Sequence, residues 1–301
     1  MSDTTATIAR VRVGVVDVGS NTVRLLVAAR RSGSLETLAE DREYLQLGEE
    51  IERLGWISES KLRETIECVR RFGARASDFG VNQLDVVVTA PGRRAANADE
   101  LVHALAEGAN ARVRVLSAEE EGLFAFEGVV AGLKQIPESV AVCDSGGGST
   151  ELVVGVAGEP HWVRSVDVGS LTVRSLLTED PPGRRAVDAA RLHVRERLDG
   201  IAPPIPKSAY ATGGTARALR RVVGRTLDAQ GFDDAIGRLA KRSAREIAAK
   251  YELDERRAWT LLGGAIVLAE MQLRLGIPLE VSRTGMREGV AAVAFSELAA
   301  A

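Results

Sequence analysis

Two stretches of this 301-residue chain share one design, and this repeat constrains the fold more than any other feature. In each stretch a valine-rich run ends in an aspartate, a short turn of Gly, Ser or Asn follows, and a second apolar run returns. Such a pattern predicts two buried strands joined as a β-hairpin. The stretches at residues 11–28 and 140–156 align without a gap, with Asp17 on Asp144 and Leu25 on Leu152. Self-similarity of this kind indicates a duplicated domain.

The segments that follow each hairpin alternate between strand-like and helix-like patterns. We expect helices over residues 60–79, 98–107, 121–132, 187–198 and 256–275, and strands over residues 85–89, 112–116 and 209–212. Residues 167–174 repeat the letters around Asp17, but Asp-Pro-Pro-Gly follows at 180–183, so we interpret them as a strand-to-helix junction. The alternation favours a mixed α/β sheet in each half, which we place at residues 1–133 and 134–301.

The composition restricts the class of protein. The chain is 45% hydrophobic and 27% charged, which is typical of globular domains and excludes disordered or collagen-like chains. Its longest apolar stretch, residues 261–271, is far shorter than the roughly 20 residues that span a bilayer. The charged residues Arg10 and Arg12 stand where a signal peptide needs its apolar core. A net charge of −3 argues against bulk binding of nucleic acid. We therefore expect a soluble, cytoplasmic protein with no nucleic-acid or membrane partner.

Cysteine and histidine give no sign of a metal centre. Cys68 and Cys143 fit neither a disulfide framework nor a metal-binding spacing, so we expect reduced, buried thiols. The three histidines share no ligand spacing, which argues against a zinc site or a serine–histidine triad.

The glycine-rich turns carry the chemistry of anion binding. Glycine lets backbone N–H groups approach an anion, whereas the aspartate before the turn would repel a bare phosphate unless a divalent cation or a water lies between them. Two such loops in register could hold a phosphate chain from both sides; the alternative is two ordinary hairpin turns. A third cluster, Gly213-Gly-Thr215, precedes a helix that we expect to open at residue 217, and is either another anion site or a simple helix start.

An acidic run, Glu119 to Glu121, follows Ser117 at the expected start of a helix. Ser117 and Glu120 fit a capping box, and acidic residues favour a helix N-terminus, so Glu119 and Glu120 have a structural explanation. Spacing alone assigns no catalytic role to Glu121.

Five motifs together resemble the exopolyphosphatase / guanosine pentaphosphate phosphohydrolase (Ppx/GppA) family. They occur in the family's order from about residue 13 to about residue 293: Asp17-Val-Gly-Ser-Asn21, Ser117-Ala-Glu-Glu-Glu121, Asp144-Ser-Gly-Gly-Gly-Ser-Thr-Glu-Leu152, Ala211-Thr-Gly-Gly-Thr215 and Gly285-Met-Arg-Glu-Gly289. The resemblance implies an α/β fold of two ribonuclease-H-like domains of the actin-like ATPase superfamily, with the site in the cleft between them.

The resemblance also implies roles for individual residues. Glu121 would be the catalytic glutamate that orients or deprotonates the attacking water. Asp144 and Glu151 match catalytic acidic positions that hold a divalent cation, expected to be Mg²⁺, and help to position that water. The other matches are phosphate-binding positions: Asp17, Gly19, Ser20 and Asn21 in the first loop, Gly146, Gly147, Gly148 and Ser149 in the second, Gly213, Gly214 and Thr215 in the third turn, and Arg93 after the strand that ends at residue 89. We hold Arg287 and Glu288 of the last motif as structural.

The chain departs from the family in two places. Pro91 and Gly92 stand where the family more often has small or aliphatic residues, so either Arg93 or Arg94 could face the ligand. The chain also lacks the helical C-terminal domains of long family members, which predicts a short-form enzyme with a preference for short chains or less processive action.

Hydrolysis of inorganic polyphosphate from its end is the leading hypothesis. Removal of the terminal phosphate of guanosine pentaphosphate is the alternative reaction, because both substrates present a terminal phosphoanhydride. A non-catalytic sensor of polyphosphate or an alarmone is a third alternative, although the presence of Glu121, Asp144 and Glu151 together favours catalysis. An actin-like ATPase or sugar kinase would share the fold but not the context of Glu121. The apolar stretch 259–275 is either a core helix, which we favour, or the face of a homodimer.

Overall fold

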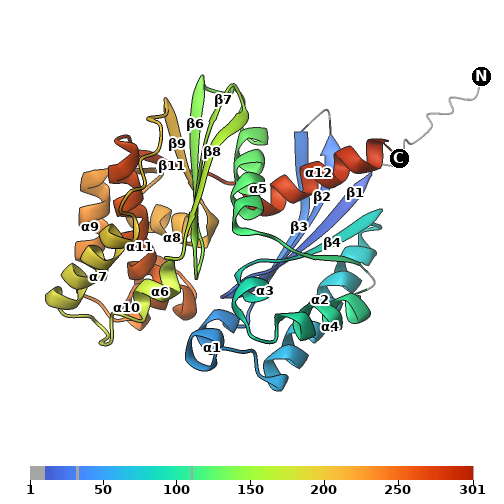
Figure 1. The fold of residues 1–301 in the computed structure, drawn as a ribbon, viewed down its shortest axis with the longest axis horizontal. Coiled ribbons are helices and arrows are strands. Elements are labelled where there is room, and N and C mark those ends of the chain that lie inside the picture. Colours follow the sequence, from blue (N-terminus) through green and yellow to red (C-terminus); the bar gives the residue numbers. More distant parts are fainter. Residues whose placement is uncertain (1–10, 32–33, 110, 301) are drawn as a thin grey trace, which may run out of the picture.

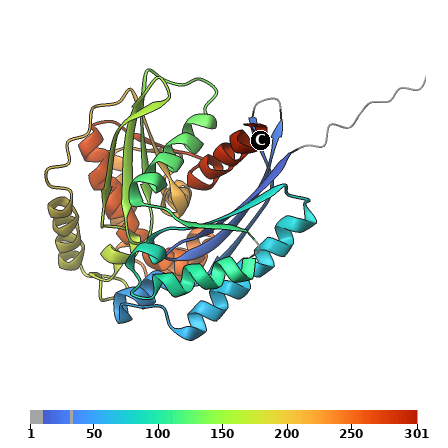
Figure 2. The ribbon, with the colours of Figure 1, turned by 45° about the vertical axis from the view of Figure 1, so that its right-hand side comes forward.

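The computed structural model describes residues 11–31, 34–109 and 111–300, and it places them in two lobes that are each built on one β-sheet (Figure 1). The view in Figure 2 shows the helices of the first lobe lying along one face of its sheet. No helix of this described part is long and apolar enough to cross a bilayer. Both cysteines are free and buried, as the sequence predicts.

The first sheet has the strand order β3-β2-β1-β4-β5. Strand β1 lies antiparallel to β2 and parallel to β4, while β3 pairs antiparallel with β2 and β5 pairs parallel with β4. The strands are β1 (Arg12–Val18), β2 (Thr22–Arg31), β3 (Ser34–Tyr44), β4 (Gln83–Val88) and β5 (Arg112–Val115).

The second sheet repeats this topology and adds one strand, in the order β10-β11-β9-β6-β7-β8. Strands β8, β7, β6, β9 and β11 take the places and directions of β3, β2, β1, β4 and β5. The strands are β6 (Ser139–Ser145), β7 (Thr150–Val156), β8 (Glu159–Val166), β9 (Ser208–Thr212), β10 (Thr226–Leu227) and β11 (Leu279–Val281). The predicted duplication and the two ribonuclease-H-like halves are thereby confirmed.

Helices cover the outer faces of both sheets. In the first lobe they are α1 (Leu47–Leu54), α2 (Glu59–Asp78), α3 (Ala90–Arg94) and α4 (Ala98–Ala109). In the second they are α6 (Ser170–Arg174), α7 (Arg184–Arg197), α8 (Gly213–Val223), α9 (Ala229–Leu239), α10 (Ala244–Tyr251) and α11 (Glu255–Leu275).

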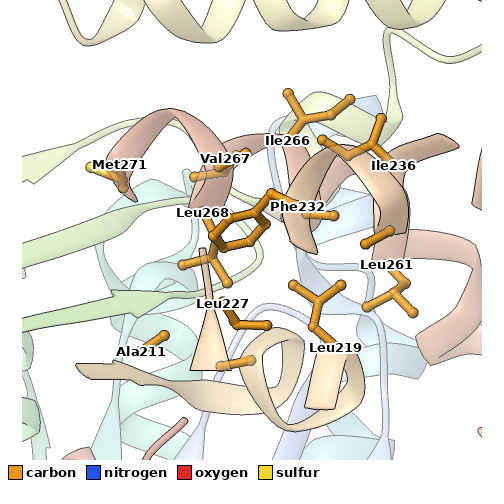
Figure 3. Packing of buried hydrophobic residues seen from close by; sticks show 14 of the residues in the cluster. Ala211, Leu219, Leu227, Phe232, Ile236, Leu261, Ile266, Val267, Leu268 and Met271 are labelled. Carbon is orange, nitrogen blue, oxygen red and sulfur yellow. The ribbon is translucent and has the colours of Figure 1, made fainter. Parts of the chain in front are cut away.

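Helix α11 forms the centre of the second lobe. It is buried along most of its length because α6, α7, α8, α9 and α10 all pack against it. Figure 3 shows Phe232 of α9 lying among Leu261 and Leu268 of α11. The preference for a core helix over a dimer face is therefore confirmed.

Two helices are exchanged between the lobes. Helix α5 (Ala118–Ala131) follows the first sheet in sequence but packs on β6, β7 and β8, whereas α12 (Met286–Ala300) follows the second sheet but packs on β1 and β2. The two helices also pack on each other (Figure 1). Their backbones approach so closely that a Cβ atom on Gly128 would overlap the carbonyl of Gly285, so only glycine fits there. A single apolar cluster accordingly draws residues from both sheets and both helices.

The sequence predicts both hairpins and the helices α2, α4, α5, α7 and α11. The Ser117 capping box is formed as expected, and the junction around residue 167 is the end of β8 followed by α6. The expected start of a helix at residue 217 is wrong, because α8 begins at Gly213. Strands β3 and β8, the third strand of each hairpin unit, were not predicted. The other elements without a prediction are β10, β11, α1, α3, α9, α10 and α12. The proposed division after residue 133 stays a prediction.

Candidate active site

The polar turns after β1 and β6 meet at one cavity between the lobes. The first turn is closed by a hydrogen bond from the Gly19 N–H to the Thr22 carbonyl, at 3.1 Å. The second is closed by the equivalent bond from Gly146 to the carbonyl of Ser149, at 3.0 Å. The duplication thus produces two loops of the same geometry, and the cavity between them has a volume of about 110 Å³.

Most of the residues predicted from the sequence line this cavity. They are Asp17, Gly19, Ser20, Asn21, Glu121, Asp144, Gly146, Gly147, Gly148, Ser149, Gly213 and Gly214. Three predicted residues, Arg93, Glu151 and Thr215, are not among the lining residues.

The two loops touch each other across the gap between the lobes. A Cβ atom on Gly147 would lie 3.1 Å from the Cβ of Ser20 and 2.9 Å from Cδ1 of Leu171. The Leu171 N–H, at the start of α6, donates to the Gly147 carbonyl at 2.8 Å. Backbone from the second loop therefore packs directly on the first loop, and a larger residue at position 147 would push them apart.

The third turn places the N-terminus of α8 at the same cavity. Gly213 has φ +88°, and a Cβ atom there would lie 2.7 Å from Oδ1 of Asp144, so glycine is needed for both backbone conformation and space. The first N–H groups of a helix have no partner within the helix and attract anions. Thr215 points elsewhere: it is buried, and its side chain lies against Gly264 of α11, so it anchors α8 to the core.

Asp17, Glu121, Asp144 and Glu288 bring carboxylates to the cavity, and the first three of them have a raised pKa. Burial, the largest cause, raises the pKa of Asp17 to about 6 and that of Glu121 to about 7. Burial also raises the pKa of Asp144. The Asp144 carboxylate contributes to both other shifts, because like charges disfavour ionisation. Glu121 is therefore poised to exchange a proton near neutral pH.

Arg93 holds Glu121 from the side of the first lobe. Its Nη2 donates to Oε2 of Glu121 at 3.0 Å, and its Nη1 donates to the carbonyl of Leu116 at 2.8 Å. The guanidinium opposes the effect of burial and lowers the pKa of Glu121. Arg93 thus orients the carboxylate that is predicted to be catalytic. Arg93 itself does not line the cavity.

Arg94 lies at the rim of the cavity instead. Its Nη2 donates to Oε1 of Glu52 in α1 at 2.5 Å. Its Nη1 would lie 2.7 Å from a Cβ atom on Gly148, so the guanidinium covers the second loop from the opposite lobe. Of the two arginines, Arg94 is the one beside the second glycine loop, and Arg93 is the one beside Glu121.

Glu151 is enclosed behind the cavity. It is 1% exposed, and its Oε1 accepts a hydrogen bond from the Ser165 hydroxyl at 3.0 Å. Burial and the neighbouring carboxylates of Glu121 and Asp144 raise its pKa well above the ordinary range. We therefore expect the side chain to be protonated when nothing cationic lies nearby.

The donor set for a divalent cation is small. Among residues 11–31, 34–109 and 111–300, no group of three or more His, Cys, Asp or Glu side chains could hold a metal ion. Asp17 and Asp144 both line the cavity, and Oδ1 of Asp17 is buried with no hydrogen-bond partner among the described residues. Mg²⁺ is usually bound by one or two carboxylates together with substrate phosphates and waters, so these residues fit such an ion.

Four arginines also line the cavity, and only one of them belongs to a motif that the sequence analysis singled out. They are Arg24, Arg217, Arg257 and Arg287. Burial is the main cause that lowers the pKa of Arg24, Arg217 and Arg257, and for Arg24 the next causes are its cationic neighbours Arg217 and Arg287. Such crowding of positive charge is relieved when an anion binds among them.

The arginines come from four elements, which is why no sequence spacing finds them. Arg24 pairs with Asp17 across the β1–β2 ladder, and Arg217 is one turn beyond Gly213 on α8. Arg287 is fixed by hydrogen bonds from Nη1 to the Leu25 carbonyl at 2.8 Å and from Nη2 to Oε1 of Glu40 at 2.6 Å. The structural role expected for Arg287 is thus present, and the residue lines the cavity as well. A sequence signal that could have identified Arg24, Arg217 and Arg287 is that each follows a glycine turn by a few residues.

Comparison with known proteins agrees with this architecture. Residues 26–297 match the Ppx/GppA phosphatase family. Exopolyphosphatase 1 of Mycobacterium tuberculosis (strain CDC 1551 / Oshkosh) is 30% identical over 302 residues, which cover 93% of this chain and 87% of that protein. Exopolyphosphatase 1 of Mycobacterium leprae (strain TN) is 28% identical over 298 residues, covering 93% and 88%.

Solved structures give the same result. The crystal structure of the Aquifex aeolicus member of the Ppx/GppA family superposes with a TM-score of 0.82 at 26% identity, and the match covers 95% of this chain and 98% of that chain. An exopolyphosphatase from Cytophaga hutchinsonii, at 20% identity and a TM-score of 0.86, covers 95% and 98% and supports the fold alone. On the match over most of its length, the chain belongs to the Ppx/GppA phosphatase family.

Proposed function

We propose that this protein is an exopolyphosphatase that releases inorganic phosphate from the end of polyphosphate. The observation that carries the proposal is the cavity itself. Glu121 faces two matched glycine loops and a third helix N-terminus, and four arginines surround them. This set of groups is complementary to several successive phosphates, and it includes one residue that can act on water.

The terminal phosphates would be held by backbone and arginine donors. Backbone N–H groups of the loops after β1 and β6 approach the anion without side-chain obstruction, and the N-terminus of α8 adds its unpaired N–H groups. Arg24, Arg217, Arg257 and Arg287 supply positive charge from fixed positions. Because phosphoryl transfer spreads negative charge over the transferring oxygens, donors fixed in this way stabilise the transition state.

Glu121 would position the attacking water and accept its proton. Arg93 occupies Oε2 of Glu121, which leaves Oε1 to accept a hydrogen bond from water. In the step that follows, a bond forms between the water oxygen and the terminal phosphorus, the water's proton passes to Glu121, and the terminal bridging P–O bond breaks. The leaving oxygen stays on the shortened chain, which can bind again by its new end. A pKa of about 7 suits a group that must be deprotonated before the step.

A divalent cation, proposed to be Mg²⁺, would be held by Asp144 and Asp17 at the cavity, with Glu151 close behind them. When bound, it would neutralise charge on the phosphate oxygens. Asp144 would hold the cation, and the raised pKa of Asp17 would fall because a cation favours the carboxylate form.

The cavity favours polyphosphate over guanosine pentaphosphate. Of the described residues that line it, none is Phe, Tyr or Trp, so no aromatic ring is present on which a guanine base could stack. The two mycobacterial relatives also carry the name exopolyphosphatase. We retain guanosine pentaphosphate as the alternative substrate.

Phosphate release tests the proposal directly. Purified protein with Mg²⁺ is incubated with tripolyphosphate, long-chain polyphosphate and guanosine pentaphosphate, beside Glu121→Gln and the matched surface variant Glu119→Gln. We expect release from polyphosphate that falls by at least two orders of magnitude in Glu121→Gln and is unchanged in Glu119→Gln, since general acid–base catalysis contributes about 10²–10⁴-fold. Tight binding of polyphosphate without release would identify a sensor, and faster release from guanosine pentaphosphate would favour the alternative reaction.

A further inference from the structure

A second arginine-lined pocket lies beside the active-site cavity. It has a volume of about 120 Å³ and is lined by Arg220, Arg225 and Arg283, with the hydroxyl-bearing residues Tyr210, Ser282 and Thr284. None of the described residues that line it is Asp or Glu. The family resemblance assigns no role to any of these six residues.

The charges in this pocket are poorly neutralised by the protein. Arg220 and Arg283 are exposed, and neither makes an ion pair within the described part of the chain. Arg225 lies 3.8 Å from Glu280, at the outer limit of an ion pair. Because the three guanidinium groups line one pocket and like charges repel, an anion bound among them would be favoured. Arginine is also suited to bidentate contact with phosphate.

Three elements contribute to both pockets, so the pockets are neighbours. On α8, Arg217 lines the active-site cavity and Arg220, three residues later, lines the second pocket. Residues at that spacing are adjacent on a helix surface. On β9, Thr212 faces the first pocket and Tyr210, two residues earlier on the same face, faces the second.

The connecting loop before α12 joins the pockets in the same way. Thr284 lines the second pocket and Gly285 the first, and the Thr212 hydroxyl donates to the Thr284 carbonyl at 2.8 Å. Along α8, Arg220 is therefore the next cation after Arg217.

We propose that the second pocket binds the distal phosphates of a chain whose end lies in the active-site cavity. The inference rests on the function proposed above. It gives the protein a length preference: a chain that reaches Arg220 and Arg283 binds more tightly than tripolyphosphate, which ends within the cavity. The ligand chemistry is a phosphate oxyanion, and its source is either the far end of the substrate or a separate phosphate ion.

The test compares wild type with Arg220→Ala/Arg283→Ala on two substrates, long-chain polyphosphate and tripolyphosphate. Arg221→Ala/Arg238→Ala is the matched control, because both residues lie on neighbouring helices and neither lines the pocket. We expect the KM for long-chain polyphosphate to rise about tenfold in the pocket variant, with the KM for tripolyphosphate within about twofold of wild type. The salt dependence of the KM for long chains should also weaken, because fewer exposed cations would be screened.

Other outcomes overturn the inference. An unchanged KM for long chains would exclude the second pocket as a binding site, while the hydrolytic function would stand. An equal rise for both substrates, with protection of wild type but not the variant by added inorganic phosphate, would identify a separate phosphate ion as the occupant.

A binding measurement keeps the inference testable if the function fails. If the wild-type protein hydrolyses neither substrate, fluorescence anisotropy with labelled long-chain polyphosphate measures binding instead. A loss of affinity in Arg220→Ala/Arg283→Ala supports the second pocket as a binding site, and equal affinity excludes it. Because both side chains are exposed, we expect the variant to fold, and circular dichroism checks this.

Discussion

Nη2 of Arg93 lies 3.0 Å from Oε2 of Glu121, although Arg93 belongs to α3, Glu121 belongs to α5, and the two residues are 28 positions apart in the chain. Both side chains are largely buried, with 21% and 12% exposed, so solvent screens the pair weakly. The contact assigns Arg93 a positioning role toward the proposed catalytic group.

Removing this cation should change the pH dependence of turnover. Arg93 lowers the pKa of Glu121, so in Arg93→Met that pKa should rise above about 7. Activity that requires the carboxylate form would then appear only at higher pH, and the acid limb of the pH–rate profile should move upward. Arg93→Lys, which keeps the charge, should shift the limb less. An unmoved limb in Arg93→Met, with Arg53→Met as the exposed control, would contradict the positioning role.

Asp17 should make folding stability fall as pH rises. The folded protein binds the Asp17 proton more tightly than the unfolded chain, because burial raises the pKa from 3.8 to about 6. The stabilisation is fully present below the unfolded pKa and is lost as pH rises through about 6. Linkage over about two pKa units corresponds to roughly 3 kcal/mol, taken as an upper limit. Denaturant unfolding between pH 4 and pH 7.5 measures it.

The matched variant isolates the contribution of this group. Asp17→Asn should flatten the fall in stability between pH 4 and 7. Asp199→Asn changes an exposed residue, so its stability should depend on pH as in the wild type. Equal slopes in wild type and Asp17→Asn would assign the pH dependence to other groups.

Gly213 should tolerate no side chain. In Gly213→Ala the Cβ atom meets Oδ1 of Asp144, and the left-handed backbone costs about 1–2 kcal/mol. We expect lower thermal stability together with a large loss of phosphate release, because Asp144 and the N-terminus of α8 must move. Gly237→Ala, in helix α9 with open space around the Cβ position, should stabilise the protein by about 0.5–1 kcal/mol and keep activity.

Arg94 and Glu52 should have opposite effects on substrate affinity. Arg94 covers the second glycine loop, and Glu52 neutralises the Arg94 guanidinium. If that loop binds phosphate as proposed, Arg94→Ala should raise KM several-fold, and Glu52→Gln should lower KM by freeing the guanidinium. Steady-state kinetics with tripolyphosphate measure both. A KM that rises in both variants would mean that the pair matters only as a fixed structural contact.

The sequence predicted the parts of the fold that rest on local hydrophobic patterns. The hairpins around Asp17 and Asp144 are buried valine-rich strands with glycine turns, and their alignment correctly indicated the duplicated topology. Strand β3 was missed because none of its eleven residues is buried, so its sequence carries no strong apolar alternation. The start of α8 was misplaced because its first two residues are glycines.

The site was predictable where a turn motif carries it. Most of the loop residues named from the sequence line the cavity, and their roles remain predictions. Arg24, Arg217 and Arg257 were not found, because each belongs to a strand or helix rather than to a turn motif and reaches the cavity only through tertiary packing. Glu151 and Thr215 belong to the right motifs, yet neither of them lines the cavity.

The exchange of α5 and α12 between the lobes also determines how the cleft can move. The chain passes from one lobe to the other just before α5 and again just before α12, and each of these helices contributes residues of its first turn, Glu121, Met286 and Glu288 among them, to the cavity. With the chain crossing between the lobes at two places, we expect rotation of the lobes about the line through these crossings to be the easiest motion. Opening would therefore carry Glu121 along with the second lobe, on which α5 packs, while Arg93 stays with the first. Cleft closure would then itself be the event that assembles the proposed catalytic pair.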